Sequence, residues 1–319
     1  MLRKLVNHAE VVVVLEPAEP LLIASGIPNA SGIDLPFVLT YRGAGDRGEP
    51  YLPGSSLKGV LRSHSERISR TLAPDARVCD PHFHKTDQQT HERIAFCGDW
   101  LSKPRSGEPF DSATVYRRSC PICRTFGSTA CRGRLAIGDA HLGDSNACPL
   151  ERRDGVGIDR FSGGASRRAK FEMQVLTRGT LQTRIRLENF EDWQLGLLAL
   201  LCRDLEDEQV SIGHATTRGL GRLRGTLSRF DVSYIVPPSR QLDHTRVHGV
   251  GSLLGDSSER GPYGYRDDDG FALDGAPPTL NTRGIRRVIS LADDPRVLRG
   301  FLDSAVAHWA RRMDEWRVS

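Results

Sequence analysis

The segment from Tyr51 to Ile68, YLPGSSLKGVLRSHSERI, constrains the fold most, because it predicts a strand end, a tight turn and a helix in direct succession. Pro53 restricts the residue before it to extended geometry. The Gly54–Ser56 turn provides side chains that cap the N-terminus of a helix. Apolar residues then recur at helical spacing, while the basic residues fall off that stripe. The sequence therefore predicts a helix over Ser55–Leu72 that opens directly on a glycine-serine turn.

The first turn of this helix collects groups that can bind a phosphate. Backbone N–H groups, the hydroxyls of Ser55 and Ser56 and the ammonium group of Lys58 converge there. Lys58 opposes the helix dipole, which favours an acidic residue at this end. The residues alone leave two interpretations open, a phosphate-binding site and an ordinary capped helix on the protein surface.

Elements with clear periodicity follow the order strand, helix, strand, strand, helix, strand. This order is typical of ferredoxin-like α+β folds, and the RNA-recognition motif shares that architecture. The aromatic signature of that motif is missing, so we expect loops and arginines, rather than a stacking sheet, to hold RNA. The strands are predicted at His8–Ala24, Gly133–Leu142, Phe171–Leu187 with a bend or bulge at Gly179, and Leu223–Ile235, and the helices at Ser55–Leu72 and Glu191–Val210.

The ferredoxin-like unit is expected to cover residues 1–235, and residues 236–319 to form a C-terminal extension. We predict loop up to residue 290 and then one amphipathic helix over Asp294–Trp316. No apolar run approaches the ~18 residues of a membrane helix, and no signal peptide is recognisable. We therefore expect a cytoplasmic protein without membrane contact.

The long insertion at residues 73–126 lacks the apolar residues of a core, so it requires another means of stabilisation. It contains a C-x-x-C turn, Cys120-Pro121-Ile122-Cys123, which presents two thiolates to one tetrahedral ion. No thioredoxin-like βαβ pattern surrounds this turn, which disfavours a redox role. The sequence predicts a structural Zn²⁺ site, with unrelated buried thiols as the alternative. The predicted ligands are Cys79, Cys97, Cys120 and Cys123, with His82 and His84 as alternative ligands.

Three segments resemble the RAMP superfamily, and specifically the backbone subunits of type III CRISPR effector complexes: PYLPGSSLKGVLRS, CPICRTFG and GHATTRGLGRLRG. In that family the first segment opens the first helix of a ferredoxin-like domain and contacts the guide RNA. The third is a glycine-rich loop between the second helix and the last strand. The resemblance implies RNA contacts at Ser55, Ser56, Lys58, Arg62, Arg218, Gly219 and Arg222.

The resemblance also implies a catalytic residue. An aspartate of the family lies in the loop after the first strand and is required, with a divalent metal, to cut the target RNA. Asp34, in the segment GIDLPF, occupies that place in order and spacing. The resemblance further implies Mg²⁺ or Mn²⁺ as the catalytic ion, with RNA phosphates as further ligands. The residues alone favour a loop aspartate that caps a turn, and Asp46 is a poorer candidate in the same loop.

A basic segment, RRDGVGIDRFSGGASRRAK, follows the second predicted strand. Seven basic residues stand between positions 152 and 178 against three acidic ones. The segment resembles the thumb hairpin of the family, which folds over the guide–target duplex, and we assign residues 150–178 to it. A solvated basic loop is the alternative. The predicted phosphate contacts are Arg160, Arg167 and Arg168.

The leading hypothesis is a subunit that binds guide RNA and cuts the paired target RNA with Asp34. Its implied partners are the guide RNA, the complementary target RNA, neighbouring RAMP subunits, and the large and small subunits of the complex. A second hypothesis is a non-catalytic scaffold of the same assembly. A third is a metal-independent endonuclease that processes the guide through a histidine such as His64 or His214. A requirement for a divalent metal in RNA cleavage distinguishes the first hypothesis from the third.

Overall fold

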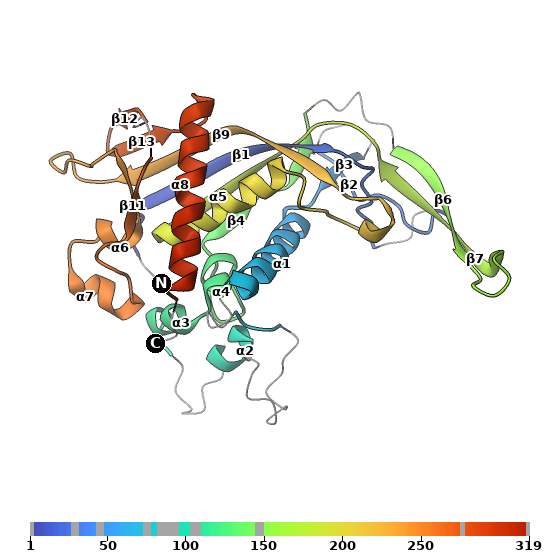
Figure 1. Cartoon of the computed structure of the whole chain (residues 1–319), viewed down its shortest axis with the longest axis horizontal. Helices are drawn as coiled ribbons and strands as arrows, with labels where there is room; N and C mark the ends of the chain where they lie inside the picture. The colour runs from blue at the N-terminus through green and yellow to red at the C-terminus, as the bar shows by residue number, and fades with distance from the viewer. Residues whose placement is uncertain are drawn as a thin grey trace.

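An antiparallel sheet organises the molecule (Figure 1). The computed structural model describes residues 3–26, 32–42, 48–72, 78–81, 96–102, 110–143, 150–274 and 278–316, without the side chain of Arg168. Within these residues the strand order is β12-β13-β9-β1-β8-β5-β3-β2, with β4 also paired to β8. The bounds are β1 (Asn7–Pro17), β2 (Leu39–Thr40), β3 (Glu49–Leu52), β4 (Leu135–Ile137), β5 (Ala140–Leu142), β8 (Leu181–Glu188), β9 (Leu223–Ile235), β12 (Leu280–Arg283) and β13 (Arg286–Ser290).

One face of this sheet is buried because its strands alternate apolar and polar residues. In β8, Leu181, Thr183, Ile185 and Leu187 are buried, while the alternate residues Gln182, Arg184 and Arg186 are more exposed. β1 lies at the centre, so that Val11 pairs with Ile185 on one side and with Phe230 of β9 on the other. Alternation of this kind sets the strand register, because a shift by one residue would expose the apolar set.

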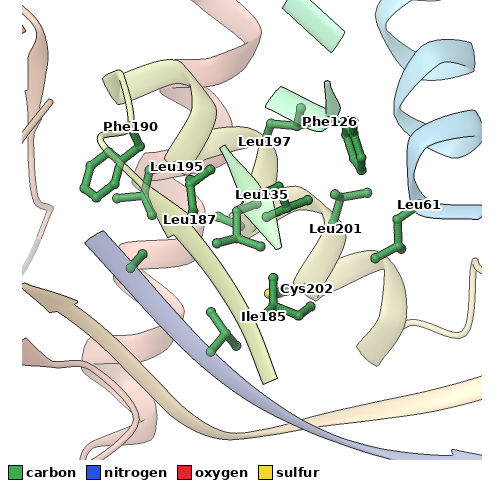
Figure 2. Packing of buried hydrophobic residues seen from close by; sticks show 14 of the residues in the cluster. Leu61, Phe126, Leu135, Ile185, Leu187, Phe190, Leu195, Leu197, Leu201 and Cys202 are labelled. Atoms are coloured by element: carbon green, nitrogen blue, oxygen red, sulfur yellow. The ribbon is translucent and has the colours of Figure 1, made fainter. Parts of the chain in front are cut away.

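Two long helices, α1 (Gly54–Leu72) and α5 (Asp192–Glu206), pack on the buried face, and α8 (Pro295–Asp314) packs against α5 (Figure 1). Figure 2 shows Leu61 of α1 and Leu197 of α5 gathered over Leu135 and Ile185 of the sheet. These helices are the predicted ones with slightly shifted ends. The mixed α+β class that the sequence predicts is confirmed, and its antiparallel sheets are consistent with ferredoxin-like folds.

Two further parts leave this layered body. Residues 96–126 contain three short helices, α2 (Cys97–Ser102), α3 (Ser112–Arg118) and α4 (Pro121–Phe126). The strands β6 (Leu150–Ile158) and β7 (Ala165–Leu176) form a separate two-stranded hairpin, which projects from the body in Figure 1. The predicted strand Phe171–Leu187 is thus two strands in different sheets. Gly179 lies between them with a φ of 124°, a conformation that only glycine adopts without strain.

The predicted loop over residues 236–290 is wrong. The chain there contains β10 (Arg246–His248), α6 (Val250–Leu253), α7 (Ser257–Arg260) and β11 (Gly270–Ala272), followed by β12 and β13. β13 pairs with β9, so the extension enlarges the main sheet instead of leaving it at residue 235. Gly264 and Gly284, both with positive φ, lie in tight turns beside these short elements. The predicted strand His8–Ala24 is also too long, since β1 ends at Pro17.

Among the described residues, no helix combines the length and the apolar character needed to cross a membrane.

Candidate functional site

Four buried cysteines meet where the insertion joins the body. Cys79 follows α1, Cys97 begins α2, and Cys120 and Cys123 lie at the start of α4; their Sγ atoms all lie within 4.8 Å of one another. The Sγ atom of Cys79 lies 3.5 Å from that of Cys123 and 3.6 Å from that of Cys120. These separations exclude disulfides and approach the ~3.8 Å that tetrahedral metal–sulfur bonds of ~2.3 Å impose. The cluster can therefore hold a metal ion such as zinc.

Hydrogen bonds within the cluster divide the thiols into two kinds. Hydrogen bonds with Cys123 and Cys79 hold the pKa of Cys120 well below its usual range. The pKa of Cys123 is raised, mainly by the hydrogen-bonding interaction of its thiol with Cys120. The backbone also donates a hydrogen bond to the cluster: the nitrogen of Cys120 lies 3.3 Å from the Sγ atom of Cys97. A divalent cation is the group that stabilises all four as thiolates together.

Arg62 connects α1 to this cluster. Its Nη2 lies 3.3 Å from the Sγ atom of Cys123, and its Nη1 donates to the carbonyl oxygen of Gly127 at 2.8 Å. Its Nε donates to Glu66 at 3.0 Å. Arg70 donates to Glu66 and to the carbonyl oxygen of Cys79, so the same face of α1 reaches two of the four cysteines. Arg62 thus contacts the cysteine cluster, and its predicted contact with RNA stays a prediction. The alternative ligands His82 and His84 lie outside the described residues.

The base of the β6–β7 hairpin forms a second site. Asp34, in the chain between β1 and β2, accepts a hydrogen bond through Oδ2 from the N–H of Glu172 in β7, at 2.8 Å. The neighbouring Leu35 donates to the carbonyl oxygen of Glu172 and accepts from the N–H of Gln174, both at 3.0 Å. These bonds fix the loop along the edge of β7, and the carboxylate of Asp34 remains exposed there. Asp46 lies outside the described residues.

The glycine-rich loop Ile212–Gly221 reaches the same strand. The guanidinium of Arg218 lies 5.7 Å from the ring centroid of Phe171, the residue before Glu172. Gly155 in β6 leaves room for that ring, because a Cβ atom at this position would lie 2.2 Å from the ring's Cζ atom. Asp34 and Arg218 therefore contact consecutive residues of β7, although their segments are far apart in the sequence.

The other two predicted contacts in this loop differ from each other. Gly219 is exposed, and a Cβ atom there would meet open space. Arg222 donates to Glu19 at 2.6 Å and also lies 3.9 Å from Glu208. Arg222 is thus paired with two acidic residues, and an RNA phosphate would have to replace one of them. At Gly219, in contrast, the backbone is accessible to a ligand.

The N-terminus of α1 is closely packed. The N–H of Gly54 donates to Oδ1 of Asp139 at 2.8 Å, and a Cβ atom on Gly54 would lie 2.4 Å from the carbonyl oxygen of Ile137. The ammonium group of Lys58 donates to the carbonyl oxygen of Leu135 at 2.9 Å. Burial and the nearby Arg62 lower the pKa of Lys58. A protein carboxylate therefore takes one of the N–H groups that the sequence offers to phosphate. Ser55 is exposed and Ser56 half-buried at this terminus.

The tip of the hairpin exposes its side chains. Arg160 and Arg167 are exposed, and Phe161 between them is fully exposed. Asp159 closes the turn through its Oδ1, which accepts from the N–H of Phe161 at 3.1 Å and of Ser162 at 2.7 Å. The backbone of Arg168 lies in β7, but its side chain is outside the described set. Two cations and one aromatic ring are thus available to a ligand at the tip.

The histidines named as alternative catalysts lie in separate places. His64 in α1 contacts Asp204 of α5, with 2.7 Å between Nε2 and Oδ2. His214 is exposed in the glycine-rich loop, and its N–H donates to the carbonyl oxygen of Leu22 at 2.9 Å. The structure does not bring these two histidines into one hydrogen-bonded site within its described part.

Comparison with known families agrees with these features. The exposed Arg160 and Arg167 place positive charge at the hairpin tip, where it is available to a nucleic-acid backbone. A model of the RAMP superfamily matches residues 40–224, more than half of the chain, and the chain belongs to this superfamily. Membership supports a CRISPR-associated, RNA-binding function, because RAMP proteins generally bind CRISPR RNA and partner subunits. No curated protein matches the chain.

Sequence reasoning missed three residues of these sites. Asp139 caps α1, Phe171 stacks with Arg218, and Phe161 is exposed at the hairpin tip. Phe161 stands beside an arginine in a glycine-rich turn, and this unusual pattern could have indicated an aromatic side chain exposed for binding. The other two depend on partners distant in the sequence, and no local pattern indicates them.

Proposed function

We propose that this protein is a guide-RNA-binding backbone subunit of a type III CRISPR effector complex. In this proposal it cleaves the complementary target RNA through Asp34 with Mg²⁺ or Mn²⁺. The complex would also supply the neighbouring RAMP subunits and the large and small subunits. Superfamily membership supports the RNA-binding part of the proposal.

The observation that carries the proposal is the convergence at the base of the hairpin. Asp34 and Arg218 contact adjacent residues of β7, and both are exposed. One oxygen of Asp34 is held by the backbone, so the carboxylate has a defined position from which to bind a cation. The guanidinium of Arg218 provides charge for an RNA backbone at the same place.

In this proposal Asp34 would bind the catalytic ion, and RNA phosphates would supply other ligands. The ion would polarise a phosphoryl oxygen or activate the attacking hydroxyl. The exposed arginines of the hairpin and the exposed Ser55 at the start of α1 would hold the RNA along the protein. The four cysteines would hold a structural Zn²⁺ that fixes α2 and α4 against α1.

The test is a cleavage assay with the protein purified together with its guide RNA and neighbouring subunits. Labelled complementary RNA is added with Mg²⁺ or without divalent ions, since a strong chelator would also attack the cysteine cluster. Asp34→Asn is the central variant, because the amide oxygen can still accept the bond from Glu172. Asp267→Asn is the matched control, because Asp267 is strongly exposed in the C-terminal extension.

We expect wild type and Asp267→Asn to cut the target only with Mg²⁺, and Asp34→Asn to bind it but cut at least about 100-fold more slowly. Equal cutting by Asp34→Asn would refute the catalytic role of Asp34. Tight binding without cutting by any protein would leave a scaffold subunit. Cutting without divalent ions would favour a histidine mechanism instead.

A further inference from the structure

A cavity lies beside α3, lined by residues of the segment 112–134 and by Tyr263. It has a volume of about 230 Å³. Its apolar walls come from Val115, Tyr116, Ala130 and Tyr263, and its basic lining comes from Arg132 and Arg134. This cavity, the tyrosine–arginine pocket, involves none of the residues assigned above to RNA or metal.

The charge of Arg134 is buried beside this pocket. The residue is only 8% exposed, and its Nη2 donates to the hydroxyl of Tyr265. Its guanidinium lies 4.3 Å from the ring centroid of Tyr116. Its Nη1 is buried and has no hydrogen-bond partner among the described residues. A buried donor without a partner is costly, so a ligand acceptor in the pocket would remove a penalty that the protein otherwise bears.

Glu191 interacts with Arg134 electrostatically but forms its ion pair with Arg124. Oε1 of Glu191 accepts from the hydroxyl of Tyr116 at 2.6 Å and lies 3.9 Å from Nη1 of Arg124. Glu191 is thus shared between Arg124 and Tyr116. Within the described part of the chain, Arg134 forms no ion pair with a carboxylate. Aromatic faces compensate part of a buried cation, and they leave it available to an acceptor-bearing ligand.

We propose that the tyrosine–arginine pocket binds one unpaired nucleobase of RNA. The base would lie against the ring of Tyr263, with an acceptor atom of its edge on Nη1 of Arg134. The exposed Arg132 would contact the attached phosphate. This inference rests on the proposed RNA-binding function and adds to it a site for one base that is unstacked from its neighbours in the RNA.

The character of the pocket favours a base over a free anion or an organic cofactor. A phosphate ion alone would use several donors, whereas the pocket offers one unpaired buried nitrogen among apolar and aromatic walls. Pockets for drug-sized ligands span ~300–1,000 Å³, so this smaller cavity suits a single ring system. Base–aromatic stacking is the usual way in which proteins hold unpaired bases.

The test uses the full chain freed of RNA at high salt. AMP, GMP, CMP and UMP are titrated separately, and inorganic phosphate in parallel, with binding followed by ligand-observed NMR. Ala130→Phe fills the pocket without changing its charges, and Arg134→Met removes the unpaired donor. Arg132→Gln removes the cation at the mouth. Arg296→Gln is the control, because the side chain of Arg296 is 94% exposed in α8 and does not line the pocket.

We expect at least one nucleotide to bind wild type and Arg296→Gln equally, and at least about tenfold more weakly to Ala130→Phe and Arg134→Met. Arg132→Gln should weaken binding less and reduce its salt dependence. A photoreactive 4-thio-UMP should crosslink to residues 112–134 or 263 of the wild-type chain, a readout that needs no variant to fold.

Absence of nucleotide binding, unchanged binding in Ala130→Phe, or full competition by phosphate would overturn the pocket proposal. Failure of the proposed function appears separately, as loss of co-purified guide RNA from the wild-type complex. A chain that retains guide RNA but binds no nucleotide would therefore refute the pocket alone.

Discussion

Arg62 illustrates how position in space changes the role of a residue. Arg62 stands one turn after Lys58 in α1, in a segment whose resemblance to the RAMP superfamily implies a contact with RNA. In the folded chain its three donor nitrogens face Glu66, Gly127 and the thiol of Cys123. A Cys₄ site with a divalent ion carries two net negative charges, and a guanidinium in contact with one sulfur reduces that charge. We infer that Arg62 supports the metal cluster from the helix side.

Replacing Arg62 should therefore weaken the binding of zinc to the four cysteines and destabilise the fold. Arg62→Met removes the donor to Cys123 and leaves the buried Glu66 with Arg70 as its partner. We expect a loss of about 2–4 kcal/mol in the free energy of unfolding, measured by urea denaturation. We also expect zinc to transfer faster to a coloured chelator. Arg67→Met, at an exposed position of the same helix, should change stability by less than about 0.5 kcal/mol. Equal chelator kinetics in both variants would contradict the role assigned to Arg62.

Among the elements, α1 depends on a close contact at its first residue. Gly54 allows the helix to approach the turn between β4 and β5, where Asp139 accepts the helix N–H. This contact positions the GSSLKG turn against the sheet. It also explains why the helix begins at Gly54, one residue before the predicted start.

Two glycine substitutions in this one helix should act in opposite directions. In Gly54→Ala the new methyl group would meet backbone atoms of Ile137 and Gly138, at 2.4 and 2.7 Å. Backbone cannot yield as a side chain does, so we expect a loss of about 1–3 kcal/mol in stability. Gly59→Ala meets nothing within 4 Å and should add about 0.5–1 kcal/mol, because alanine is the better helix former. Thermal and urea unfolding measure both, and a stabilised Gly54→Ala would contradict the close contact.

Over the whole molecule, Asp192 joins the C-terminal extension to the body. Its Oδ2 accepts from Nη2 of Arg312 in α8 at 2.8 Å and from the N–H of Gly270 at 2.9 Å. It also lies 2.9 Å from Nε2 of His308. The side chain of Asp192 is 2% exposed, so these contacts are shielded from water. Residues from α5, α8 and β11 thus depend on one carboxylate.

Removal of this carboxylate should release the extension. Asp192→Ala leaves Arg312 and His308 buried without their main acceptor, and we expect a loss of about 3–5 kcal/mol at pH 7. Asp303→Ala is the control, because Asp303 is an exposed residue of the same helix α8 and its ion pair with Arg203 contributes about 0–1 kcal/mol. Hydrogen exchange should show whether α8 opens before the sheet does.

The pH dependence of that loss follows from the pKa of Asp192. Burial alone would raise this pKa, but hydrogen bonds from His308 and Arg312 outweigh it and hold the pKa below its usual value. The stability from these contacts is therefore complete above the unfolded-state pKa of about 4 and is lost as the pH falls through the folded-state pKa. We expect the difference in stability between wild type and Asp192→Ala to narrow below about pH 4 in urea titrations. A difference that stays constant down to pH 2 would contradict this assignment.

The sequence by itself determined the α+β class, the positions of α1, α5 and α8, and the set of cysteines that meet at one point. These features depend on local periodicity, on turn residues and on the chemistry of four identical side chains, which neighbouring residues largely specify. Only the tertiary structure decided that β13 extends the sheet, that Arg62 contacts the thiol of Cys123, and that Asp34 and Arg218 both contact β7. Each of these is a contact between segments far apart in the chain. Its free energy comes from packing and hydrogen bonds that exist only once the sheet has formed.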